Sequence, residues 1–415
     1  MGNPERITII GGGVIGLACA HYLLDEGCRV TIVERDLVGA GSSHGNCGLL
    51  YYSDALPLCT PGAVSKEIVR TLCGTSPLYV KPEPDFGRLF WLARFAGHCR
   101  HTHMRQAAKD KLPILQYSAH LFEALWQLPD MACELEKKGI LYVFKEHKNF
   151  KKFGETSEYL DQFDLGWEPM TASQALELEP AFTDDIAGAW YSRVDHHLRP
   201  DLLMRNWRKH LVQKGLTVIE NCSVLDFIRE GGRLSGIKTT QGTITDDAFV
   251  LATGAWSSPL ASKLKLKLPI QPGKGYSITM NRPEPCPSLP CILYEKNMVV
   301  TPWESGYRLG GTMEFSGFGT HLNQHRLNKL KSGAAEYMKS PYGTICQEEW
   351  TSLRPMTWDD MPVIDRAPGY ENLVVATGHG MLGLTLATGT GKLVSDMLLN
   401  KPTKIPVHPY RMDRF

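Results

Sequence analysis

The sequence predicts an α/β protein, in which a Rossmann-like unit is joined to a second, α+β domain built on a mixed sheet. Three observations support this prediction. A strand, a glycine-rich turn, a helix and a second strand follow one another at residues 6–34. Apolar strands that end in glycine recur near residues 249–254 and 373–378. The length of 415 residues also exceeds what a single hydrophobic core usually supports.

The N-terminal unit is defined by its hydrophobic patterning. Arg6–Ile10 is apolar and β-branched, which is typical of a buried parallel strand. Val14–Leu24 has apolar residues at helical spacing, and Gly27 provides a C-terminal stop. Arg29–Val33 repeats the strand pattern and ends at Glu34. These segments together predict a compact βαβ unit.

The turn of this unit carries a dinucleotide fingerprint. Gly11, Gly13 and Gly16 form a GxGxxG motif, which permits a tight turn, close approach of a pyrophosphate and packing of the helix on the strand. The free amides and the dipole at the start of the helix favour the anion. Glu34 can accept hydrogen bonds from a ribose and would repel a 2′-phosphate, which disfavours NADP. The residues of this unit that are predicted to contact the dinucleotide are Gly11, Gly13, Val14, Ile15, Gly16, Glu34 and Arg35.

Composition and charge narrow the possible partners. The 45 basic and 44 acidic residues give a formal charge of +1, so we expect a small-molecule ligand and no nucleic acid. Eleven scattered cysteines without a CxxC pair favour reduced thiols in a cytoplasmic protein, and we expect no metal site. The apolar run Ile7–Leu24 is interrupted by four glycines and by His21, so it is predicted to be neither a signal peptide nor a membrane span.

Further motifs follow the N-terminal unit in a specific order. They are Gly39–Gly48, Leu178–Ala181, Gly273–Ser277, Arg308–Thr312, Leu353–Met356 and Thr377–Gly380. In this order they resemble the FAD-dependent amino-acid oxidoreductases, which include glycine oxidase, sarcosine oxidase and D-amino-acid oxidase. The most similar subgroup is the bacterial D-amino-acid dehydrogenase small subunit. The resemblance implies that the dinucleotide is FAD. We expect it to be non-covalent, because His44 does not align with the histidine that attaches flavin in some relatives.

The remaining FAD contacts are expected in several separate segments. The loop 39–48 suits a backbone that runs close to a flat ring and a diphosphate, with Ser42 and Ser43 as phosphate donors. A strand, a turn and a second strand at 218–224 are expected beside the adenine. The segment 249–257 resembles the family's second glycine turn, where Trp256 either contacts the cofactor or packs in the core.

Near the C-terminus, the turn 378–383 precedes a predicted helix at 385–399. The N-terminus of this helix is expected to stabilise the negative charge of reduced flavin. His379 is either a flavin contact or an ordinary loop histidine. Beyond the N-terminal unit, the predicted FAD contacts are Ser42, Ser43, His44, Gly48, Leu49, Val224, Thr253, Gly254, Trp256, Gly378, His379, Gly380, Met381, Leu382, Gly383, Leu384 and Thr385.

Because these contacts are scattered, the FAD-binding domain is predicted to be discontinuous. It comprises residues 1–60, 188–262 and 348–415, whereas residues 61–187 and 263–347 form the substrate domain. Helical patterning dominates residues 114–138. Residues 268–312 are rich in β-branched and aromatic side chains, which predicts a mixed sheet that closes over the flavin.

The resemblance also implies three residues on the substrate side. Arg354 is expected to anchor the substrate carboxylate with its planar guanidinium, and the alternative is an ion pair with Asp359 or Asp360. Tyr276 either orients the substrate through its hydroxyl or packs in the core. Arg308 is matched with a basic residue beside flavin N5 in sarcosine oxidase.

The implied reaction is oxidation of the carbon–nitrogen bond of a small amino acid. A neutral amine transfers a hydride to flavin N5 in a dry site, and the resulting imine either hydrolyses to an oxo acid or remains cyclic. A D-amino acid is expected, with the proline and hydroxyproline types as candidates by analogy. The alternatives are a sarcosine- or glycine-type amine oxidase that uses oxygen, a flavoprotein electron-transfer subunit of a larger complex, and an NAD-dependent enzyme.

The sequence leaves the electron acceptor open between a quinone and oxygen. The dehydrogenase subgroup implies a carrier at the membrane, so a peripheral contact with the inner face of the membrane is an alternative to a purely cytoplasmic protein. Phe86–Phe95, followed by basic residues to Arg105, either lies on a membrane surface or packs as a helix inside the second domain.

Overall fold

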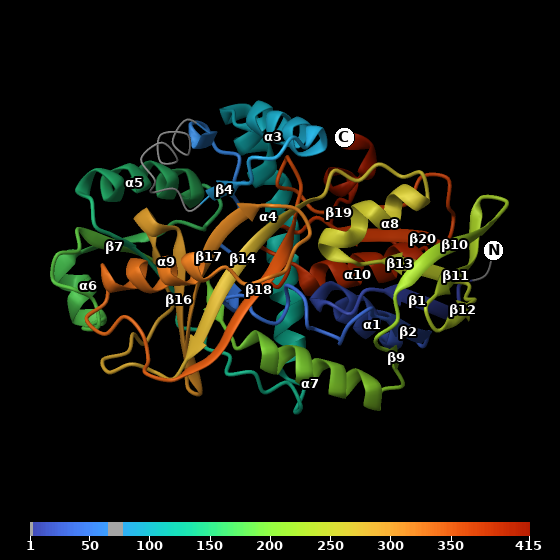
Figure 1. The fold of residues 1–415 in the computed structure, drawn as a ribbon, viewed down its shortest axis with the longest axis horizontal. Coiled ribbons are helices and arrows are strands. Elements are labelled where there is room, and N and C mark those ends of the chain that lie inside the picture. The colour runs from blue at the N-terminus through green and yellow to red at the C-terminus, as the bar shows by residue number, and fades with distance from the viewer. Residues whose placement is uncertain (1–2, 65–77) are drawn as a thin grey trace.

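The computed structural model of the protein describes residues 3–64 and 78–415. Its first layer is a six-stranded sheet with the order β19-β20-β13-β1-β2-β9, on the right of Figure 1. The strands run parallel except β19, which is antiparallel to β20 at the edge. They are β1 (Arg6–Ile10), β2 (Arg29–Val33), β9 (Thr217–Ile219), β13 (Ala248–Leu251), β19 (Val363–Arg366) and β20 (Leu373–Thr377). Three distant parts of the chain therefore build one Rossmann-like sheet.

Two helices cover one face of this sheet. They are α1 (Val14–Asp25) and α10 (Ala387–Leu398), which pack against each other, while α4 (His101–Trp126) packs against α10. α1 is buried along most of its length because its side chains are apolar nearly all round. At the crossing of the two helices, Gly391 lies directly against the backbone of Ala18.

The second layer is a nine-stranded mixed sheet with the order β18-β14-β17-β16-β15-β5-β7-β6, and β4 pairs with β17. It lies on the left of Figure 1, where α5, α6 and α9 surround it. Its strands are β4 (Leu78–Val80), β5 (Ile140–Phe144), β6 (Glu168–Thr171), β7 (Gly188–Ser192), β14 (Gln271–Met280), β15 (Cys291–Leu293), β16 (Met298–Trp303), β17 (Gly306–Phe315) and β18 (Cys346–Met356). Three long neighbouring strands, β14, β17 and β18, form the part that faces the first layer.

Smaller elements complete the described residues. The helices are α3 (Phe86–His98), α5 (His147–Asp161), α6 (Ala172–Leu178), α7 (Pro200–Gln213), α8 (Ser257–Lys263) and α9 (Gln324–Ala335). The remaining strands are β3 (Leu49–Leu50), β8 (His196–His197), β10 (Val224–Glu230), β11 (Arg233–Thr239) and β12 (Gly242–Ile244). β10, β11 and β12 form a separate antiparallel sheet at the far right of Figure 1.

The predicted secondary structure is confirmed in the N-terminal unit and is wrong in places elsewhere. The helix expected over 385–399 begins two residues later, at Ala387. The helical pattern of 114–138 ends at Trp126, because Pro129 disfavours helical backbone at the residue before it. β7 and β18 were assigned to the FAD-binding domain, but they pair with β5 and β14 of the second sheet. The domain limits proposed at residues 188 and 348 therefore move to the ends of these strands.

The described residues contain no membrane-spanning helix, no metal-binding cluster and no disulfide. Within residues 3–64 and 78–415, no helix has the length and apolar character needed to cross a bilayer. In the same part of the chain, His, Cys, Asp and Glu side chains form no group that could hold a metal ion. The cysteines that the structure describes are free thiols, and Cys73 lies outside the described residues.

We predict that Gly391→Ala destabilises the fold, because the new Cβ would lie 2.5 Å from the carbonyl carbon and oxygen of Ala18. Forcing a methyl group into a packed helix crossing should cost about 1–3 kcal/mol. Urea unfolding of the FAD-loaded protein measures the change in free energy of unfolding. Gly97→Ala is the matched control, since a Cβ on Gly97 in α3 meets open space and should be neutral or stabilising. Equal effects of the two substitutions would contradict the prediction.

Candidate active site

A cavity of about 1320 Å³ is lined by residues of both sheets. The first sheet contributes the ends of β1, β2, β13 and β20, and the second sheet contributes β14, β17 and β18. Pockets for one small molecule usually occupy about 300–1,000 Å³. The cavity is therefore large enough for a dinucleotide together with a second, smaller ligand.

The glycine turn brings the backbone to the edge of this cavity. Gly11 ends β1 with a φ of +107°, and a Cβ there would overlap the carbonyl oxygen of Ala252. A Cβ on Gly16 would overlap the carbonyl oxygen of Gly11, so this glycine lets α1 begin directly against β1. The residues of this turn that line the cavity are Gly11, Gly13, Val14 and Ile15.

The tip of β2 carries a carboxylate on the cavity wall. Glu34 accepts hydrogen bonds from the amides of Gly12 (2.7 Å) and Asp36 (3.0 Å), which fix its orientation. Its two oxygens keep further acceptor sites, as recognition of ribose hydroxyls requires. The guanidinium of Arg35 lies 3.6 Å from the ring centroid of Trp256, and both side chains line the cavity. This end has the groups expected around an adenosine, and it also includes Val224, Thr253 and Gly254.

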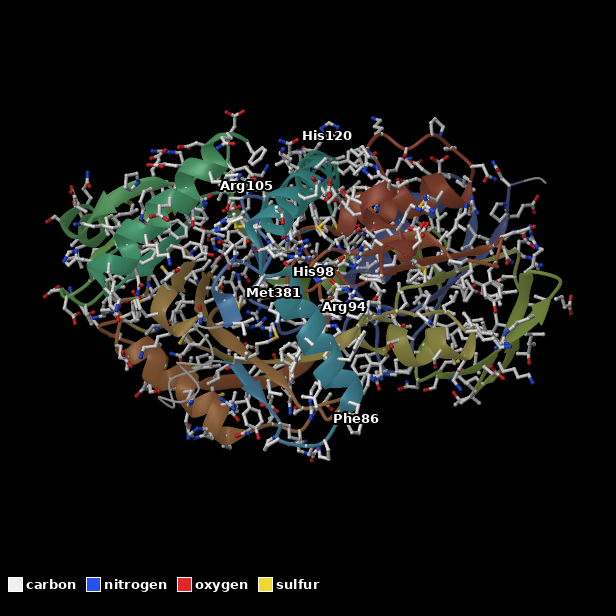
Figure 2. All side chains as sticks on the ribbon, turned by 90° about the horizontal axis from the view of Figure 1, so that it is seen from above. Phe86, Arg94, His98, Arg105, His120 and Met381 are labelled. Atoms are coloured by element: carbon white, nitrogen blue, oxygen red, sulfur yellow. The ribbon has the colours of Figure 1, made fainter. Side chains whose placement is uncertain are left out.

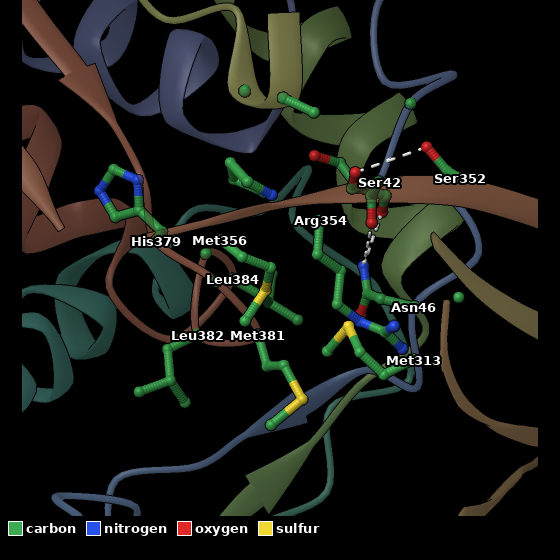
Figure 3. Close-up of a pocket in the computed structure, with 18 of the residues that line it drawn as sticks. Ser42, Asn46, Met313, Ser352, Arg354, Met356, His379, Met381, Leu382 and Leu384 are labelled. Atoms are coloured by element: carbon green, nitrogen blue, oxygen red, sulfur yellow. Dashed lines mark hydrogen bonds between the residues drawn. The ribbon is translucent and has the colours of Figure 1, made fainter. Parts of the chain in front are cut away.

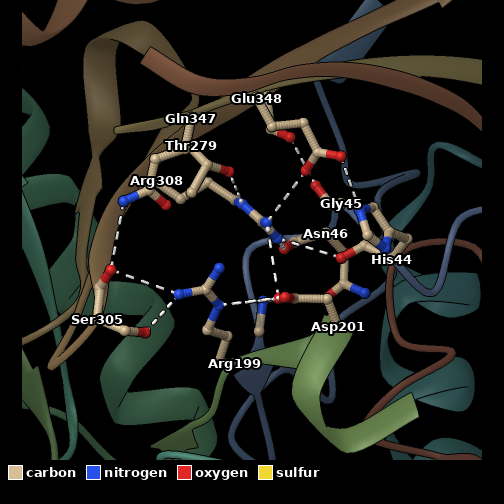
Figure 4. Close-up of polar contacts among 12 residues, drawn as sticks. His44, Gly45, Asn46, Arg199, Asp201, Thr279, Ser305, Arg308, Gln347 and Glu348 are labelled. Carbon is tan, nitrogen blue, oxygen red and sulfur yellow. Dashed lines mark hydrogen bonds and ion pairs between the residues drawn. The ribbon is translucent and has the colours of Figure 1, made fainter. Parts of the chain in front are cut away.

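The loop 42–48 runs between the two sheets and is held by the second one, as Figure 4 shows around Arg308. Three side chains of the second sheet donate to its carbonyl oxygens: Ser277 to Gly45 (2.8 Å), Thr301 to Cys47 (2.8 Å), and Arg308 to Asn46 (2.7 Å) and His44 (3.2 Å). On the other side, the amide of Val14 at the start of α1 donates to the hydroxyl of Ser43 (2.9 Å). The loop thus connects the first helix to the second sheet.

Arg308 is not part of the cavity lining, so its predicted place at the reaction centre is corrected. Its side chain is 1% exposed. Besides the loop carbonyls, it donates to Thr279 (2.8 Å) and lies 3.8 Å from Glu348 and 3.9 Å from Asp201. Because these groups use its donors, Arg308 positions the loop from behind.

Four predicted cofactor contacts also lie outside the lining: Gly16, His44, Gly378 and Thr385. The imidazole of His44 lies 2.8 Å from a carboxylate oxygen of Glu348 instead. The hydroxyl of Thr385 accepts the amide of Tyr51 (3.0 Å), and Gly378 packs against Thr357 with a φ of +75°. His44 and Thr385 thus use polar groups within the protein, and the two glycines allow close packing at their positions.

The turn before α10 forms another wall, lined by His379, Gly380, Met381, Leu382, Gly383 and Leu384. His379 is buried, which lowers its pKa to about 3, so it is neutral at physiological pH. One of its nitrogens lies 3.0 Å from the hydroxyl of Thr390 in α10, as expected of an ordinary loop histidine. Met381 is 48% exposed and marks the mouth of the cavity.

Arg354 reaches into the cavity from β18, and Figure 3 shows its side chain beside Asn46 and Met313. The guanidinium lies over Gly275, where a Cβ would come within 2.6 Å of its central carbon. One nitrogen donates to the carbonyl of Thr312 (2.9 Å). Burial lowers the pKa of Arg354, although arginine keeps its proton in proteins.

The alternative ion pairs proposed for Arg354 are not formed. Asp359 pairs with Arg414 (2.7 Å), and Asp360 pairs with Lys111 (3.2 Å). Among the residues that the structure describes, no carboxylate lies within ion-pair distance of Arg354. A buried cation without a counter-charge is costly, so this position fits an anionic ligand.

Tyr276 lines the cavity, and its hydroxyl has a partner within the protein. The hydroxyl hydrogen-bonds to the carboxylate of Glu314 (3.0 Å), and the ring belongs to the hydrophobic cluster of the second sheet. Burial and the adjacent Glu314 raise the pKa of Tyr276. These contacts favour the core-packing alternative for Tyr276, which also lines the cavity.

The cavity residues that sequence reasoning did not name include Asn46, Tyr51 and Asp54. The Asn46 amide donates to the carbonyls of Ser42 (3.2 Å) and Ser43 (3.0 Å), and its oxygen accepts the amide of Gly48 (2.8 Å). An asparagine between two glycines is a signal for such an internally bonded turn. Tyr51 and Asp54 had no comparable local signal.

Comparison with known proteins shows which family this chain belongs to. The sequence model of the family described as FAD dependent oxidoreductase matches residues 6–397. The chain belongs to this family. FAD is therefore its cofactor, and the protein is an FAD-dependent oxidoreductase related to amino-acid dehydrogenases and oxidases.

Individual relatives are similar over nearly the whole chain. The D-amino acid dehydrogenase of Neisseria gonorrhoeae is 28% identical over 417 residues, and that of Bradyrhizobium diazoefficiens is 29% identical over 416 residues. Each alignment covers 99% of both chains. Among solved structures, glycine oxidase from Geobacillus kaustophilus has a TM-score of 0.81 at 22% identity, with 99% of both chains covered. That likeness confirms the predicted fold.

The geometry of the cavity fits FAD. A side chain at Gly11 would overlap the backbone of Ala252, so this turn packs tightly against the chain that follows β13. Gly13 and Val14 at the start of α1 line the cavity, and Glu34 stands at the distance along the chain expected for the ribose. We propose that the diphosphate lies at the start of α1 and that the flavin lies between loop 42–48 and the turn 379–384.

We predict that Arg308→Gln lowers the affinity of the apoprotein for FAD without changing which substrates bind. Hydrogen bonds from a charged donor to the carbonyls of His44 and Asn46 contribute about 1.5–3 kcal/mol each, so the loss should be at least about 10-fold in Kd. FAD titration of the apoprotein measures it. Thr301→Val removes one donor and should give a smaller effect, and the exposed Arg411→Gln is the control. Unchanged FAD affinity together with weaker substrate binding would contradict this prediction and would support a role of Arg308 in binding the substrate.

Proposed function

We propose that the protein is a dehydrogenase that uses FAD to oxidise the carbon–nitrogen bond of a D-amino acid. The observation that carries this proposal is Arg354, a cation without a counter-charge among the described residues, in the cavity that fits FAD. The D-amino acid dehydrogenases that match the chain over 99% of its length support the choice of substrate class.

Arg354 would hold the substrate carboxylate through its guanidinium. Its contact with the carbonyl of Thr312 fixes the orientation of the side chain and leaves other nitrogens for the ligand. A planar cation pairs with a carboxylate through two parallel hydrogen bonds, which sets both position and orientation. The substrate's α-carbon is then held at a defined distance from this wall.

The surrounding walls would keep water from the reacting bond. Met313 and Met356 lie near Arg354, and Leu382 and Leu384 belong to the turn before α10. FAD, when bound, accepts the hydride, so the protein has mainly to bind, orient and keep the site dry. The imine product would hydrolyse in solution to an oxo acid, whereas a proline-type substrate would leave as a cyclic imine.

The outer surface of α3 supports a membrane carrier as the electron acceptor. The inner side of the helix lines the cavity with Trp91, Leu92 and Phe95. Its outer side exposes Phe86 (84%), Leu89 and Phe90. An exposed apolar helix face with basic residues beside it is typical of a segment that lies on an anionic membrane.

Basic side chains on the same face of the molecule complement anionic lipids. Arg94, Arg100 and Arg105 are exposed, and Figure 2 shows Phe86, Arg94, Arg105 and Met381 on one face. Since Met381 marks the mouth of the cavity, a bilayer on this face would meet the entrance. A lipid-soluble quinone is then a more accessible acceptor than it would be for an enzyme far from the membrane.

Arg354→Lys should weaken the binding of amino-acid substrates while the FAD content stays unchanged. Lysine keeps the charge but loses the planar pair of donors, so the dissociation constant should rise at least about 10-fold. Anaerobic titration of flavin absorbance with a panel of D- and L-amino acids, sarcosine and glycine measures affinity and stereochemistry together. The exposed Arg411→Lys is the control. Unaltered substrate affinity would remove Arg354 from this role, and reduction by no amino acid would overturn the proposed function.

Wild-type protein should sediment with vesicles that contain anionic phospholipid, and more weakly as salt is raised. Leu89→Glu combined with Phe90→Glu should reduce binding at least about 10-fold, because each apolar side chain contributes up to about 1.5–3 kcal/mol when buried in lipid. Leu225→Glu is the control, since Leu225 is also exposed but lies on β10. A loss of the same size in both variants, or no vesicle binding by the wild type, would contradict the membrane contact.

A further inference from the structure

The cavity contains a carboxylate that the proposed reaction does not use. The charged side chains that line it are Glu34, Arg35, Asp36, Asp54 and Arg354. The first three follow β2 at the end proposed for the adenosine. Within the described part of the chain, the rest of the cavity is therefore lined by one cation, Arg354, and one acidic group, Asp54.

Asp54 lies at an aromatic compartment, which we define as the cavity-lining rings of Tyr51, Tyr142, Phe153, Trp167 and Tyr294. These rings contact one another: the centroids of Tyr142 and Trp167 are 4.7 Å apart, and those of Tyr142 and Phe153 are 5.0 Å apart. Aromatic faces attract cations, and the attraction is stronger where water is excluded. A carboxylate at such a compartment completes a site for a positively charged group.

The groups around Asp54 are already engaged with other partners. Lys111 pairs with Asp360 (3.2 Å) and donates to the carbonyl of Leu56 (3.3 Å). Asp195 accepts hydrogen bonds from the amide and hydroxyl of Ser53. In the part of the chain that the structure describes, no hydrogen bond or ion pair reaches the carboxylate of Asp54. A ligand cation would supply the partner that the protein does not.

Asp54 and Arg354 carry opposite charges on the wall of one cavity. Burial raises the pKa of Asp54 to about 7, Lys111 lowers it, and the neighbouring Asp360 and Asp195 raise it further. Asp54 lies in the segment that follows β3, whereas Arg354 lies on β18 of the second sheet. The two groups therefore suit a ligand that carries opposite charges at its two ends.

The substrate's α-amine is not the natural partner of Asp54. It adjoins the carboxylate that Arg354 would hold, and it has to lose its proton before the hydride leaves. A carboxylate paired with it would favour the protonated form and oppose the reaction. The partner of Asp54 should then be a charge at the far end of the side chain.

We infer that Asp54 and the aromatic compartment select α-amino acids whose side chain ends in a cation, an ammonium or a guanidinium group. This inference rests on the proposed function, in which Arg354 holds the α-carboxylate. Asp54 forms the ion pair with the side-chain cation, and the rings of the compartment enclose it. Neutral side chains of the same length bind the rings but leave the carboxylate unpaired.

The test compares D-lysine with D-norleucine, which has the same carbon chain without the ammonium group. Stopped-flow reduction of the FAD-loaded protein without oxygen gives the apparent Kd and the reduction rate for each. Wild type should bind D-lysine at least about 10-fold more tightly. Asp54→Asn should abolish this preference and leave D-norleucine unchanged, whereas Asp54→Glu should restore part of it. Asp185→Asn, an exposed carboxylate of an ion pair with Lys145, is the control.

The pH dependence gives a second measurement on the same samples. The groups that face Asp54 are Lys111, Asp195, Asp360, Tyr51 and Tyr142. Because Asp54 becomes ionised as the pH rises through about 7, the affinity for D-lysine should increase over that range, while its side-chain ammonium, with a pKa near 10.4, stays charged. The increase should be absent in Asp54→Asn.

The possible outcomes distinguish failure of the inference about Asp54 from failure of the proposed function. Reduction by D-norleucine without a preference for D-lysine would overturn the inference and leave the proposed function standing. An equal fall for both substrates in Asp54→Asn would also overturn it, because it would indicate a general role of Asp54 in the reaction or the fold. If no amino acid of either hand reduces the flavin, the proposed function fails, and this inference fails with it.

Discussion

The carbonyl groups of residues 44–47 in loop 42–48 are satisfied by donors from the second sheet, and this constraint organises the cavity. An unpaired buried carbonyl costs about 1–3 kcal/mol. Ser277, Thr301 and Arg308 meet that requirement from β14, β16 and β17. At its other end, the loop places the hydroxyl of Ser43 on the first amide of α1. One loop therefore sets how the start of the first helix faces the second sheet, and with it the shape of the space between them.

Two arginines near this loop differ in how far the protein satisfies their hydrogen-bond donors. Arg308 is 1% exposed, and its donors meet two loop carbonyls and the hydroxyl of Thr279. Arg354 is directed into the cavity and has a single hydrogen bond, to Thr312, among the described residues. Both guanidinium groups lose bound water on folding, but Arg308 replaces it with hydrogen-bond acceptors within the protein. In the role proposed for Arg354, the carboxylate of the substrate supplies the missing partners, so binding energy is reserved for the ligand.

The helix α3 has two different environments on its two sides. Its inner aromatic side chains line the cavity, whereas Phe86, Leu89 and Phe90 face outward. A helix at the surface of a soluble domain usually has a polar outward face. Exposed apolar patches of this kind mark contact surfaces. The same helix thus belongs both to the site of chemistry and to the surface proposed for the acceptor. A carrier bound on that surface would be separated from the cavity by one helix.

The sequence predicted those parts of the fold in which short-range constraints are strong. The βαβ unit at residues 6–34 is recognisable because strand, tight turn and helix each require particular residues within a few positions, and Gly11 and Gly16 have no substitutes where backbone groups nearly touch. β20 was predicted for the same reason, as a continuous apolar run that ends in glycine. β7 and β18 were assigned to the wrong sheet, because strand pairing depends on partners far along the chain.

For the site, sequence alone determined the family of chemistry, and it named Gly11, Gly13 and Arg354, which the structure places on the cavity wall. It did not determine the direction of side chains on the long strands. Arg308, Tyr276 and His44 carry suitable functional groups, but the tertiary structure turns them to Thr279, Glu314 and Glu348. Asp54 was missed because its environment is built by residues far from it in sequence, such as Tyr142 and Lys111. A side chain acquires a role at the cavity only when distant elements leave it facing that space, and no local pattern encodes this.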